Sequence, residues 1–361
     1  MLLGHEKISF LHLPTPIERL DNLSAKLGIN LYIKRDDLTP LAAGGNKLRK
    51  LEYFLADAKA KGATMLLTVG GAQTNHGRLT CAVARKYGMK AAIVCVDEYP
   101  GELSANLLLD GMMGCDVWLR KKDPAGTKPE GALLMETVAE VTKNYEKQGE
   151  KVYYIPMGGS NELGILGYYE CAAETAGQLA ESGIASGSRE FPRLITTVGS
   201  MGTYMGLFTG IRMENLPLRL TGIGIMPYEN GIRTYAKNYF DKVYGFDTTC
   251  GRASGVTEND FDITDKYDRG AYNNPCKEVR EAMYLAAEKE ALILDPCYTG
   301  KCFAGMVEMV KKGEIAQDET VIFLHTGGMP GINTPFHRVE IEKERDKFIN
   351  VLDENGCIVV R

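Results

Sequence analysis

Short apolar runs rich in β-branched residues alternate along the chain with longer segments in which apolar residues recur at helical spacing. The short runs predict buried strands, and the longer segments predict helices. The predicted strands are Leu31–Lys34, Met65–Val69, Ala91–Val96, Val117–Leu119, Val152–Ile155, Leu194–Val198, Leu220–Ile225 and Val321–His325. The predicted helices are Lys47–Lys61, Asn75–Tyr87, Ala105–Met113, Gly131–Gln148, Glu162–Leu179, Tyr204–Met213, Cys276–Lys289 and Phe303–Lys311. This alternation predicts an open α/β fold of parallel sheets, with ligands beyond the carboxyl ends of the strands.

Two polar stretches that contain glycine interrupt this alternation. Glu181–Arg189 is short and is expected to be a surface linker. Tyr228–Asn274 is long for a connection in a compact domain, so it is either a functional loop region or contains elements that the pattern does not reveal. A chain of 361 residues also exceeds the usual size of one core, which favours two domains.

Composition narrows the class of protein. The net charge is −5 and no long basic run occurs, which argues against binding to nucleic acid or to anionic membranes. Residues 1–10 lack the features of a signal peptide, and no window is apolar enough to span a membrane. The nine cysteines include no C-x-x-C pair, and the five histidines are scattered. We therefore expect a cytoplasmic protein with reduced thiols and without a metal centre.

The first chemically informative stretch is Gly44-Gly45-Asn46-Lys47. The two glycines allow an unusual backbone, and Asn46 could cap the helix that follows. Lys47 falls in the first helical turn, where the helix dipole lowers the pKa of an amine and so makes it a better nucleophile towards an aldehyde. The alternative is a solvated lysine at a helix start. Lys50 lies on about the same face of the helix, and composition does not choose between the two lysines.

Two further strands run into glycine turns that open helices. Residues 68–76 read TVGGAQTNH, and free N–H groups at such a turn would bind an anion such as a carboxylate, although an ordinary loop capped by Thr74 or Asn75 is the simpler interpretation. Residues 197–206 read TVGSMGTYMG, where backbone amides and hydroxyl groups could cradle a phosphate. The second turn matches neither the Walker loop nor the dinucleotide-binding fingerprint, which counts against a kinase or a dehydrogenase.

Several motifs in a fixed order carry a family resemblance. They are Leu13-Pro14-Thr15-Pro16-Ile17, Gly44-Gly45-Asn46-Lys47, Leu294-Asp295-Pro296-Cys297-Tyr298-Thr299-Gly300-Lys301 and Leu324-His325-Thr326-Gly327-Gly328. With these motifs the chain resembles the fold-type II pyridoxal phosphate (PLP) enzymes, the tryptophan synthase β-subunit superfamily. Within that superfamily it is most similar to the group of D-cysteine desulfhydrase and 1-aminocyclopropane-1-carboxylate (ACC) deaminase. The resemblance extends nearly from end to end.

The resemblance implies a homodimer that acts on a small amino acid. It also implies a large PLP-binding domain of residues 1–58 and 166–361 and a small α/β domain of residues 59–165. Lys47 would bind the cofactor covalently and then move protons at the substrate, and the Gly199–Gly206 loop would hold the cofactor phosphate. Asn75 would bind the ring hydroxyl, and Thr299 would face the pyridine nitrogen.

The residues implied by the resemblance fall into three sets. The cofactor-binding set is Lys47, Asn75, Gly199, Ser200, Met201, Gly202, Thr203 and Thr299. The substrate-binding set is Gly71, Gln73, Thr74, Asn75 and His76. The catalytic set is Lys47, Thr74, Tyr298 and Tyr272.

The chain departs from the family's patterns at three places. Thr74 stands where the family usually has serine, so substrate shape or rate could differ. Met201 replaces a glycine of the phosphate loop, and the surroundings of Tyr272 differ from the usual G-Y-G-x-P.

A fourth position concerns the reaction. ACC deaminases have an acid next to the tyrosine, as in Y-E-G-K, whereas this chain has Thr299, as the desulfhydrases do. A carboxylate would keep the pyridine nitrogen protonated and strengthen the electron sink, which opening a cyclopropane should need more than expelling a thiolate. We therefore expect β-elimination from D-cysteine. The alternatives are L-cysteate, whose sulfonate would recruit a cation from Arg49, Lys50, His76 or Arg78, and ACC. A non-catalytic binding protein is the remaining rival.

Overall fold

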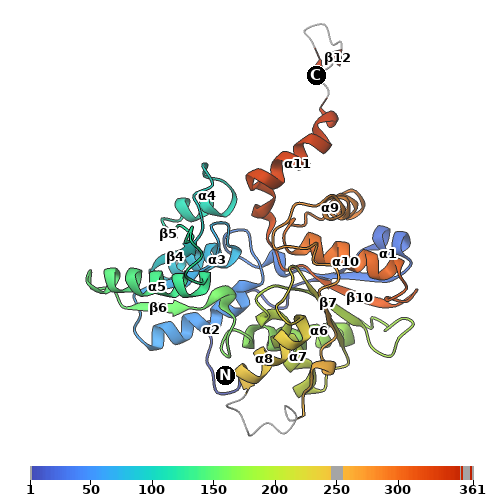
Figure 1. Ribbon diagram of the computed structural model, residues 1–361. Helices are drawn as coiled ribbons and strands as arrows, with labels where there is room; N and C mark the ends of the chain where they lie inside the picture. Colours follow the sequence, from blue (N-terminus) through green and yellow to red (C-terminus); the bar gives the residue numbers. More distant parts are fainter. Residues whose placement is uncertain (1, 245–254, 350, 353–357, 360–361) are drawn as a thin grey trace.

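The computed structural model describes residues 2–244, 255–349, 351–352 and 358–359, and helices and strands alternate along it as the pattern predicts (Figure 1). The strands are β1 (Ile17–Arg19), β2 (Asn30–Lys34), β3 (Met65–Val69), β4 (Lys90–Val96), β5 (Asp116–Arg120), β6 (Val152–Ile155), β7 (Arg193–Val198), β8 (Arg219–Gly224), β9 (Ile263–Thr264), β10 (Thr320–Leu324), β11 (Val351–Leu352) and β12 (Ile358–Val359). The α-helices are α1 (Asp21–Leu27), α2 (Lys47–Ala60), α3 (Asn75–Lys86), α4 (Ala105–Met112), α5 (Glu130–Glu146), α6 (Leu166–Glu181), α7 (Gly202–Glu214), α8 (Ile232–Tyr244), α9 (Lys277–Glu290), α10 (Thr299–Lys311) and α11 (Pro335–Arg345).

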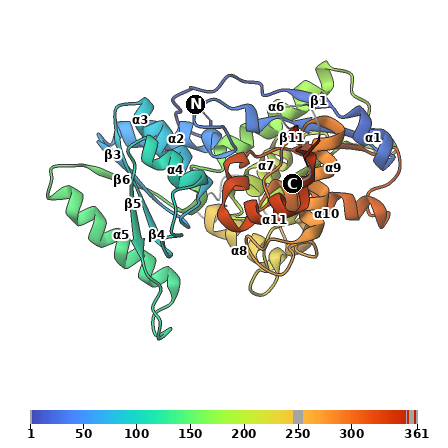
Figure 2. The same cartoon turned by 90° about the horizontal axis from the view of Figure 1, so that it is seen from above.

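The smaller sheet has four parallel strands in the order β5-β4-β3-β6. Successive side chains of a strand point to opposite faces, so each buried strand contributes to two cores. Leu66 and Ile93 pack with residues of α2 and α3, whereas Leu67 and Val94 pack with residues of α5. Figure 2 shows α5 on one face of this sheet and α2, α3 and α4 on the other.

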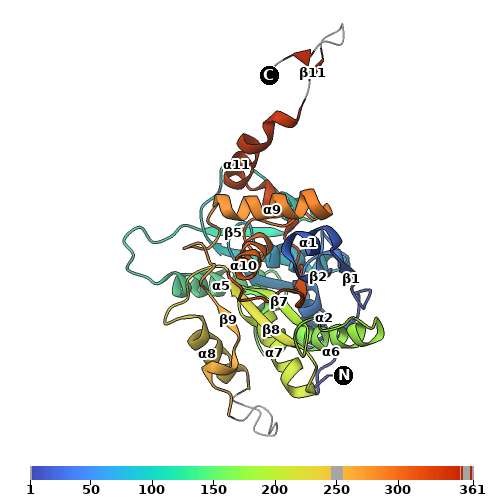
Figure 3. The ribbon, with the colours of Figure 1, turned by 90° about the vertical axis from the view of Figure 1, so that its right-hand side faces the viewer.

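The larger sheet has the order β1-β2-β10-β7-β8-β9, and every pair is parallel except β1 with β2. Ile195 and Phe323 face the core that includes α9 and α10, and Leu194 and Ile322 face the core that includes α6 and α7. Figure 3 shows these two helix layers on opposite sides of the sheet, with α11 extending away from the body of the molecule. Both faces are therefore covered, as the near-continuous apolar strands require.

All eight predicted strands and all eight predicted helices are present; β3 and β6 have the predicted ends, and the other elements have shifted ends. The largest shifts are at α6, which begins at Leu166 and not at Glu162, and at α10, which begins at Thr299 and not at Phe303. The stretch Tyr228–Asn274 contains α8 and β9, so it holds elements that the pattern did not reveal, and its residues 245–254 lie outside the described residues. The strands of the smaller sheet all lie between residues 59 and 165, and the division into two domains stays a prediction.

Two further features concern the described residues. The seven cysteines among them are unpaired, while Cys250 and Cys357 lie outside. No helix in this part of the chain is both long enough and apolar enough to cross a membrane.

Candidate active site

The turn before Lys47 requires its two glycines. Gly44 has a φ of +62° and Gly45 a φ of +133°. A Cβ on Gly44 would lie 2.2 Å from the carbonyl oxygen of Asp37, and a Cβ on Gly45 would lie 3.2 Å from that of Thr326. The turn is therefore packed against the segment that follows β10, and α2 begins at Lys47 beside two motifs that are distant in sequence.

Asn46 does not cap α2, contrary to the expectation from the sequence. Its main-chain N–H donates to the carbonyl of Thr326 at 3.1 Å. Its side-chain amide donates to the hydroxyl of Thr203 at 3.0 Å, in the glycine turn after β7. Asn46 therefore connects the lysine turn to the predicted phosphate loop.

Lys47 has the properties of a reactive amine. Its side chain is partly buried, and its Nζ forms no hydrogen bond or ion pair within the part of the chain that the structure describes. Burial lowers the pKa of Lys47 from 10.5 to about 8, because desolvation disfavours the charged form. The direction agrees with the prediction, and burial is the cause that the structure adds.

Lys50 is the more enclosed of the two lysines. Its side chain is fully buried, and its Nζ donates to the carbonyl oxygen of Gly158 at 3.1 Å. Burial, followed by the charge of Lys47, lowers its pKa well below the usual value. A Cβ on Gly202 would lie 2.8 Å from the Nζ of Lys50, so this amine is next to the first residue of α7.

The glycine turn after β7 forms an anion cradle with a second turn that the sequence analysis did not identify. The hydroxyl oxygens of Ser200 and Ser160 are 2.7 Å apart. A Cβ on Gly158 would lie 2.3 Å from the Ser200 hydroxyl, and a Cβ on Gly202 would lie 2.6 Å from that of Ser160. The N-terminus of α7, two hydroxyl groups and the Lys50 amine therefore converge, which suits a phosphate. The sequence feature that could have identified this second turn is the glycine pair that precedes Ser160 after β6.

Met201 adopts a backbone conformation that glycine would adopt more easily. It has a φ of +64° and a ψ of −30° at the start of α7, and its side chain is buried. The departure from the family's glycine at this position is therefore accommodated by backbone strain, offset by the burial of an apolar side chain.

Thr74 caps α3, and its methyl group lies between the start of the turn at Gly70 and the first turn of α3 at Gly77. Its hydroxyl accepts a hydrogen bond from the N–H of Gly77 at 3.3 Å. A Cβ on Gly77 would lie 2.4 Å from the Thr74 methyl and 2.6 Å from Ile93. The extra methyl of threonine therefore packs against α3 and β4.

The turn after β3 presents N–H groups as an anion site would. The N–H of Ala72 donates to the Asp97 carboxylate at 2.9 Å. The N–H groups of Gln73, Asn75 and His76 have no acceptor among the described residues. Burial and the charge of Lys47 lower the pKa of His76 well below its usual value, so the imidazole is neutral.

A buried arginine orients the Asn75 amide. The Oδ1 of Asn75 accepts from Arg78 Nη1 and from Asn106 Nδ2, both at 3.0 Å. The other nitrogen of the Arg78 fork donates to the carbonyl of Gly44 at 2.9 Å. Because Oδ1 is occupied, the Nδ2 of Asn75 is left as the donor that can meet a ligand. The sequence did not single out Arg78 or Asn106 for orienting Asn75, and only their hydrogen bonds in the structure identify them.

Two predicted tyrosines meet at the third glycine turn. The hydroxyls of Tyr272 and Tyr298 are 2.5 Å apart, and their rings pack edge to face with centroids 5.9 Å apart. A Cβ on Gly199 would lie 3.5 Å from the Tyr298 ring. Burial raises the pKa of Tyr298, which keeps the phenol protonated at neutral pH.

Thr299 is held by a buried carboxylate. Its hydroxyl donates to Asp295 Oδ1 at 2.7 Å, and the N–H of Asp295 donates back to this hydroxyl at 2.9 Å. The second oxygen of Asp295 accepts from the N–H groups of Cys297 and Tyr298 at 2.9 and 2.8 Å. This cluster fixes the start of α10, where Tyr298 and Thr299 lie.

Comparisons with known proteins agree with these features. Residues 8–327 match the family model described as pyridoxal-phosphate dependent enzyme. A putative 1-aminocyclopropane-1-carboxylate deaminase from Thermotoga maritima is 37% identical, over 88% of this chain and 95% of its own length. A D-cysteine desulfhydrase from Yersinia enterocolitica is 36% identical, over 88% of this chain and 92% of its own length.

A solved structure has the same fold. The crystal structure of an ACC deaminase homologue superimposes with a TM-score of 0.79 at 32% identity, covering 95% of this chain and 97% of the other. An O-ureido-L-serine synthase, at 17% identity, shares the fold with a TM-score of 0.60. The chain therefore belongs to the pyridoxal-phosphate-dependent enzymes, in the family whose members are named ACC deaminase and D-cysteine desulfhydrase.

Proposed function

We propose that this enzyme catalyses α,β-elimination on a small sulfur-containing amino acid, with D-cysteine as the first candidate and pyruvate, sulfide and ammonia as products. The observation that carries the proposal is Thr299, which follows Tyr298 at the position where an acid would favour ring opening. Its hydroxyl donates to Asp295. L-Cysteate, with release of sulfite, is the alternative substrate, and ACC, with 2-oxobutyrate and ammonia as products, is a further alternative.

The residues of the site fit PLP. Lys47 offers an amine with a pKa of about 8 to the aldehyde. The N-terminus of α7, the hydroxyls of Ser160 and Ser200 and the Lys50 amine fit the phosphate. The free Nδ2 of Asn75 fits a ring hydroxyl. Bound PLP supplies an electron sink for the negative charge that develops at the substrate α-carbon.

The protein's own groups would position the substrate and move its protons. The N–H groups of Gln73, Asn75 and His76 would bind the substrate carboxylate. Lys47, once released by the substrate, would remove the α-proton as a neutral amine. The protonated Tyr298 hydroxyl, supported by Tyr272 at 2.5 Å, would donate a hydrogen bond to the departing sulfur.

The choice of elimination over ring opening rests on charge. Thr299 cannot keep a pyridine nitrogen protonated, and its proton is already directed at Asp295. A thiolate is a good leaving group, whereas the strained carbon–carbon bond of ACC requires a stronger electron sink. The names of the relatives support both substrates, so the assignment depends on this position.

The sulfonate of L-cysteate finds less support. The guanidinium of Arg49 is buried between the carboxylates of Asp36 and Glu174, at 2.8 and 2.9 Å. The Arg78 guanidinium is engaged with Asn75 and with neighbouring groups. Neither is available to a sulfonate without breaking these contacts.

A substrate panel on the PLP-loaded enzyme tests the proposal. Sulfide, sulfite, pyruvate and 2-oxobutyrate would be measured from D-cysteine, L-cysteine, L-cysteate and ACC, for the wild type and for Thr299→Glu. We expect sulfide and pyruvate from D-cysteine and no 2-oxobutyrate from ACC in the wild type. Production of 2-oxobutyrate from ACC by the wild type would overturn the argument from Thr299. Release of sulfite from L-cysteate would keep the elimination reaction and change the proposed substrate to L-cysteate.

We also propose the family's homodimer, a cytoplasmic location and the two domains with the boundaries given above. Sedimentation of the holoenzyme tests the first of these directly.

A further inference from the structure

Lys301 is a buried amine that no step above uses. Its side chain is fully buried, and its Nζ donates to the carbonyl oxygens of Ile225 at 2.8 Å, of Asp268 at 2.9 Å and of Ala271. Three acceptors match the three donors of an ammonium group. Within the described residues Lys301 has only carbonyl oxygens as partners and forms no ion pair, which is unusual because a fully buried lysine is commonly paired with an acid.

The three carbonyls come from two segments that are distant in sequence. Ile225 directly follows β8, and Asp268 and Ala271 lie in the loop of residues 267–274, which carries Tyr272. Lys301 itself lies in the first turn of α10, two residues after Thr299. The ammonium group of Lys301 therefore connects the end of β8, the start of α10 and the loop that places Tyr272 next to Tyr298.

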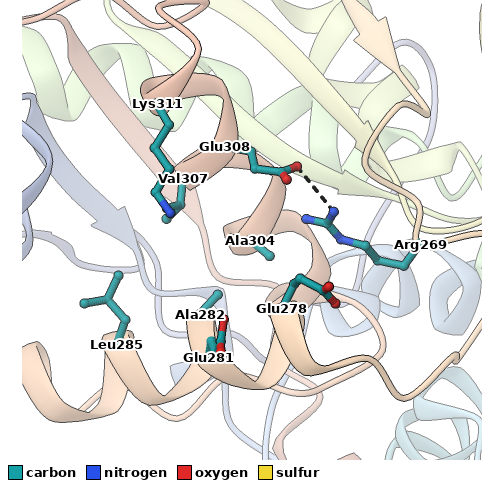
Figure 4. Close-up of a pocket in the computed structure, with 9 residues that line it drawn as sticks. All are labelled: Arg269, Glu278, Glu281, Ala282, Leu285, Ala304, Val307, Glu308 and Lys311. Carbon is teal, nitrogen blue, oxygen red and sulfur yellow. Dashed lines mark hydrogen bonds and ion pairs between the residues drawn. The ribbon is translucent and has the colours of Figure 1, made fainter.

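The loop of residues 267–274 needs external support. Arg269 and Asn273 have φ values of +64° and +56°, a conformation that side chains other than glycine adopt only when their surroundings impose it. On the outer side, Arg269 forms an ion pair with Glu308 of α10 at 3.3 Å, beside a cavity of about 270 Å³ between α9 and α10 (Figure 4). On the inner side, Lys301 donates to two carbonyls of the loop, and Gly305 of α10 packs against Tyr267.

We propose that Lys301 is a positioning residue that holds the 267–274 loop so that the hydroxyl of Tyr272 meets that of Tyr298. Its three carbonyls then form an ammonium-binding site that a small alkylammonium ion can refill. The catalytic part of this inference rests on the proposed function, in which Tyr298 acts at the substrate. The structural part concerns the loop alone and holds whatever the substrate is.

The test compares Lys301→Ala and Lys301→Met with Lys311→Met, which removes an exposed lysine from the same helix, and with Tyr272→Phe. Propylammonium replaces the atoms that Lys301→Ala removes, and 1-propanol is a neutral probe of similar size. The first readout is amide hydrogen exchange of residues 267–274 in the cofactor-free protein. The second is kcat and KM for D-cysteine in the holoenzyme, with the visible absorbance of the bound cofactor as a check of loading.

We expect Lys301→Ala to speed exchange in this loop and to lower kcat by about 100-fold, because a displaced catalytic group costs about that much. Cofactor loading should not change. Propylammonium should reverse both effects, whereas 1-propanol should not. Lys301→Met, whose side chain fills the space without the charge, should show the same loss without rescue, and Lys311→Met should behave as the wild type.

Wild-type loop exchange and wild-type kcat in Lys301→Met would overturn the proposal, and this variant decides the matter if the alanine variant does not fold. If Lys301→Ala shows faster amide exchange in the loop and propylammonium does not reverse it, the proposed ammonium-binding site is refuted. If the wild type releases no sulfide from D-cysteine, the proposed function fails, and the exchange measurements still decide whether Lys301 holds the loop.

Discussion

The lowered pKa of Lys47 predicts how fast the cofactor-free protein captures PLP at each pH. Only the neutral amine attacks an aldehyde. Burial lowers the pKa of this amine from 10.5 to about 8, and no carboxylate among the described residues pairs with it. The rate of capture should therefore rise with pH and level off at a pH far below that of an exposed lysine.

The size of the effect follows from the two pKa values. With a pKa of about 8, roughly 9% of the amine is neutral at pH 7, roughly 50% at pH 8 and roughly 90% at pH 9. With a pKa of 10.5, only about 0.03% would be neutral at pH 7. We thus expect the rate to increase between five- and sixfold from pH 7 to 8, and less than twofold from pH 8 to 9.

Rapid mixing of PLP with cofactor-free protein measures this rate through the visible absorbance of the product. The reference is Nα-acetyl-lysine, which removes the pH dependence of PLP itself from the comparison. The variant Lys47→Ala controls for capture by other lysines, and Lys50 is the important one because it lies nearby. A tenfold increase for each pH unit up to pH 10, parallel to the reference, would refute the assignment of a depressed pKa to Lys47.

Three other changes have definite expected outcomes. Burial raises the pKa of Asp110 from 3.8 to about 7, and its carboxylate has no hydrogen-bond partner among the described residues. The folded state therefore holds a proton that the unfolded state releases, so the free energy of unfolding of the wild type falls as pH rises from about 4 to 7. In urea titrations, the free energy of unfolding of Asp110→Asn should increase relative to that of the wild type by up to about 4 kcal/mol over that range. A difference that stays constant with pH would contradict this. Lys50→Met should weaken PLP binding about 10- to 100-fold in equilibrium dialysis, because a charge-assisted contact to phosphate is lost, and unchanged affinity would remove Lys50 from the phosphate site. Thr74→Ser should lower the free energy of unfolding by less than about 1 kcal/mol, through one partly buried methyl group, without changing the ratio of rates on D-cysteine and ACC. A changed ratio would mean that the methyl faces the substrate.

The buried parallel strands were predictable because their apolar runs are continuous and are separated by helical patterns. The short strand β1 was not, because three residues show no period. Helix α8 was missed although its buried residues Ile232, Ala236 and Phe240 recur at helical spacing, and α1 and α11 were missed as well. The start of α10 was placed too late because Tyr298, which precedes it, and its first residues Thr299 and Gly300 form no apolar stripe. Where this helix begins depends on the hydrogen bonds of Asp295, which a pattern of apolar residues does not reveal.

The candidate site was predictable where glycine turns follow strands. The sequence indicated the turns around Lys47, Thr74 and Ser200, and the structure brings these three turns together. It did not indicate which charged residues are buried. Arg78 was considered only as one possible cation for a sulfonate, and Lys301 lay outside the predicted helices. Only the folded chain surrounds their charged groups with acceptors.

The central claim is that PLP is bound to Lys47 in this site, and the presence of two neighbouring lysines makes it testable. The holoenzyme would be reduced with borohydride and digested, and the pyridoxyl group would be located by peptide mass spectrometry. We predict that the label lies on Lys47 alone, and that Lys47→Ala yields colourless, unlabelled protein. Label on Lys50 or on a surface lysine, with Lys47 unmodified, would contradict the account.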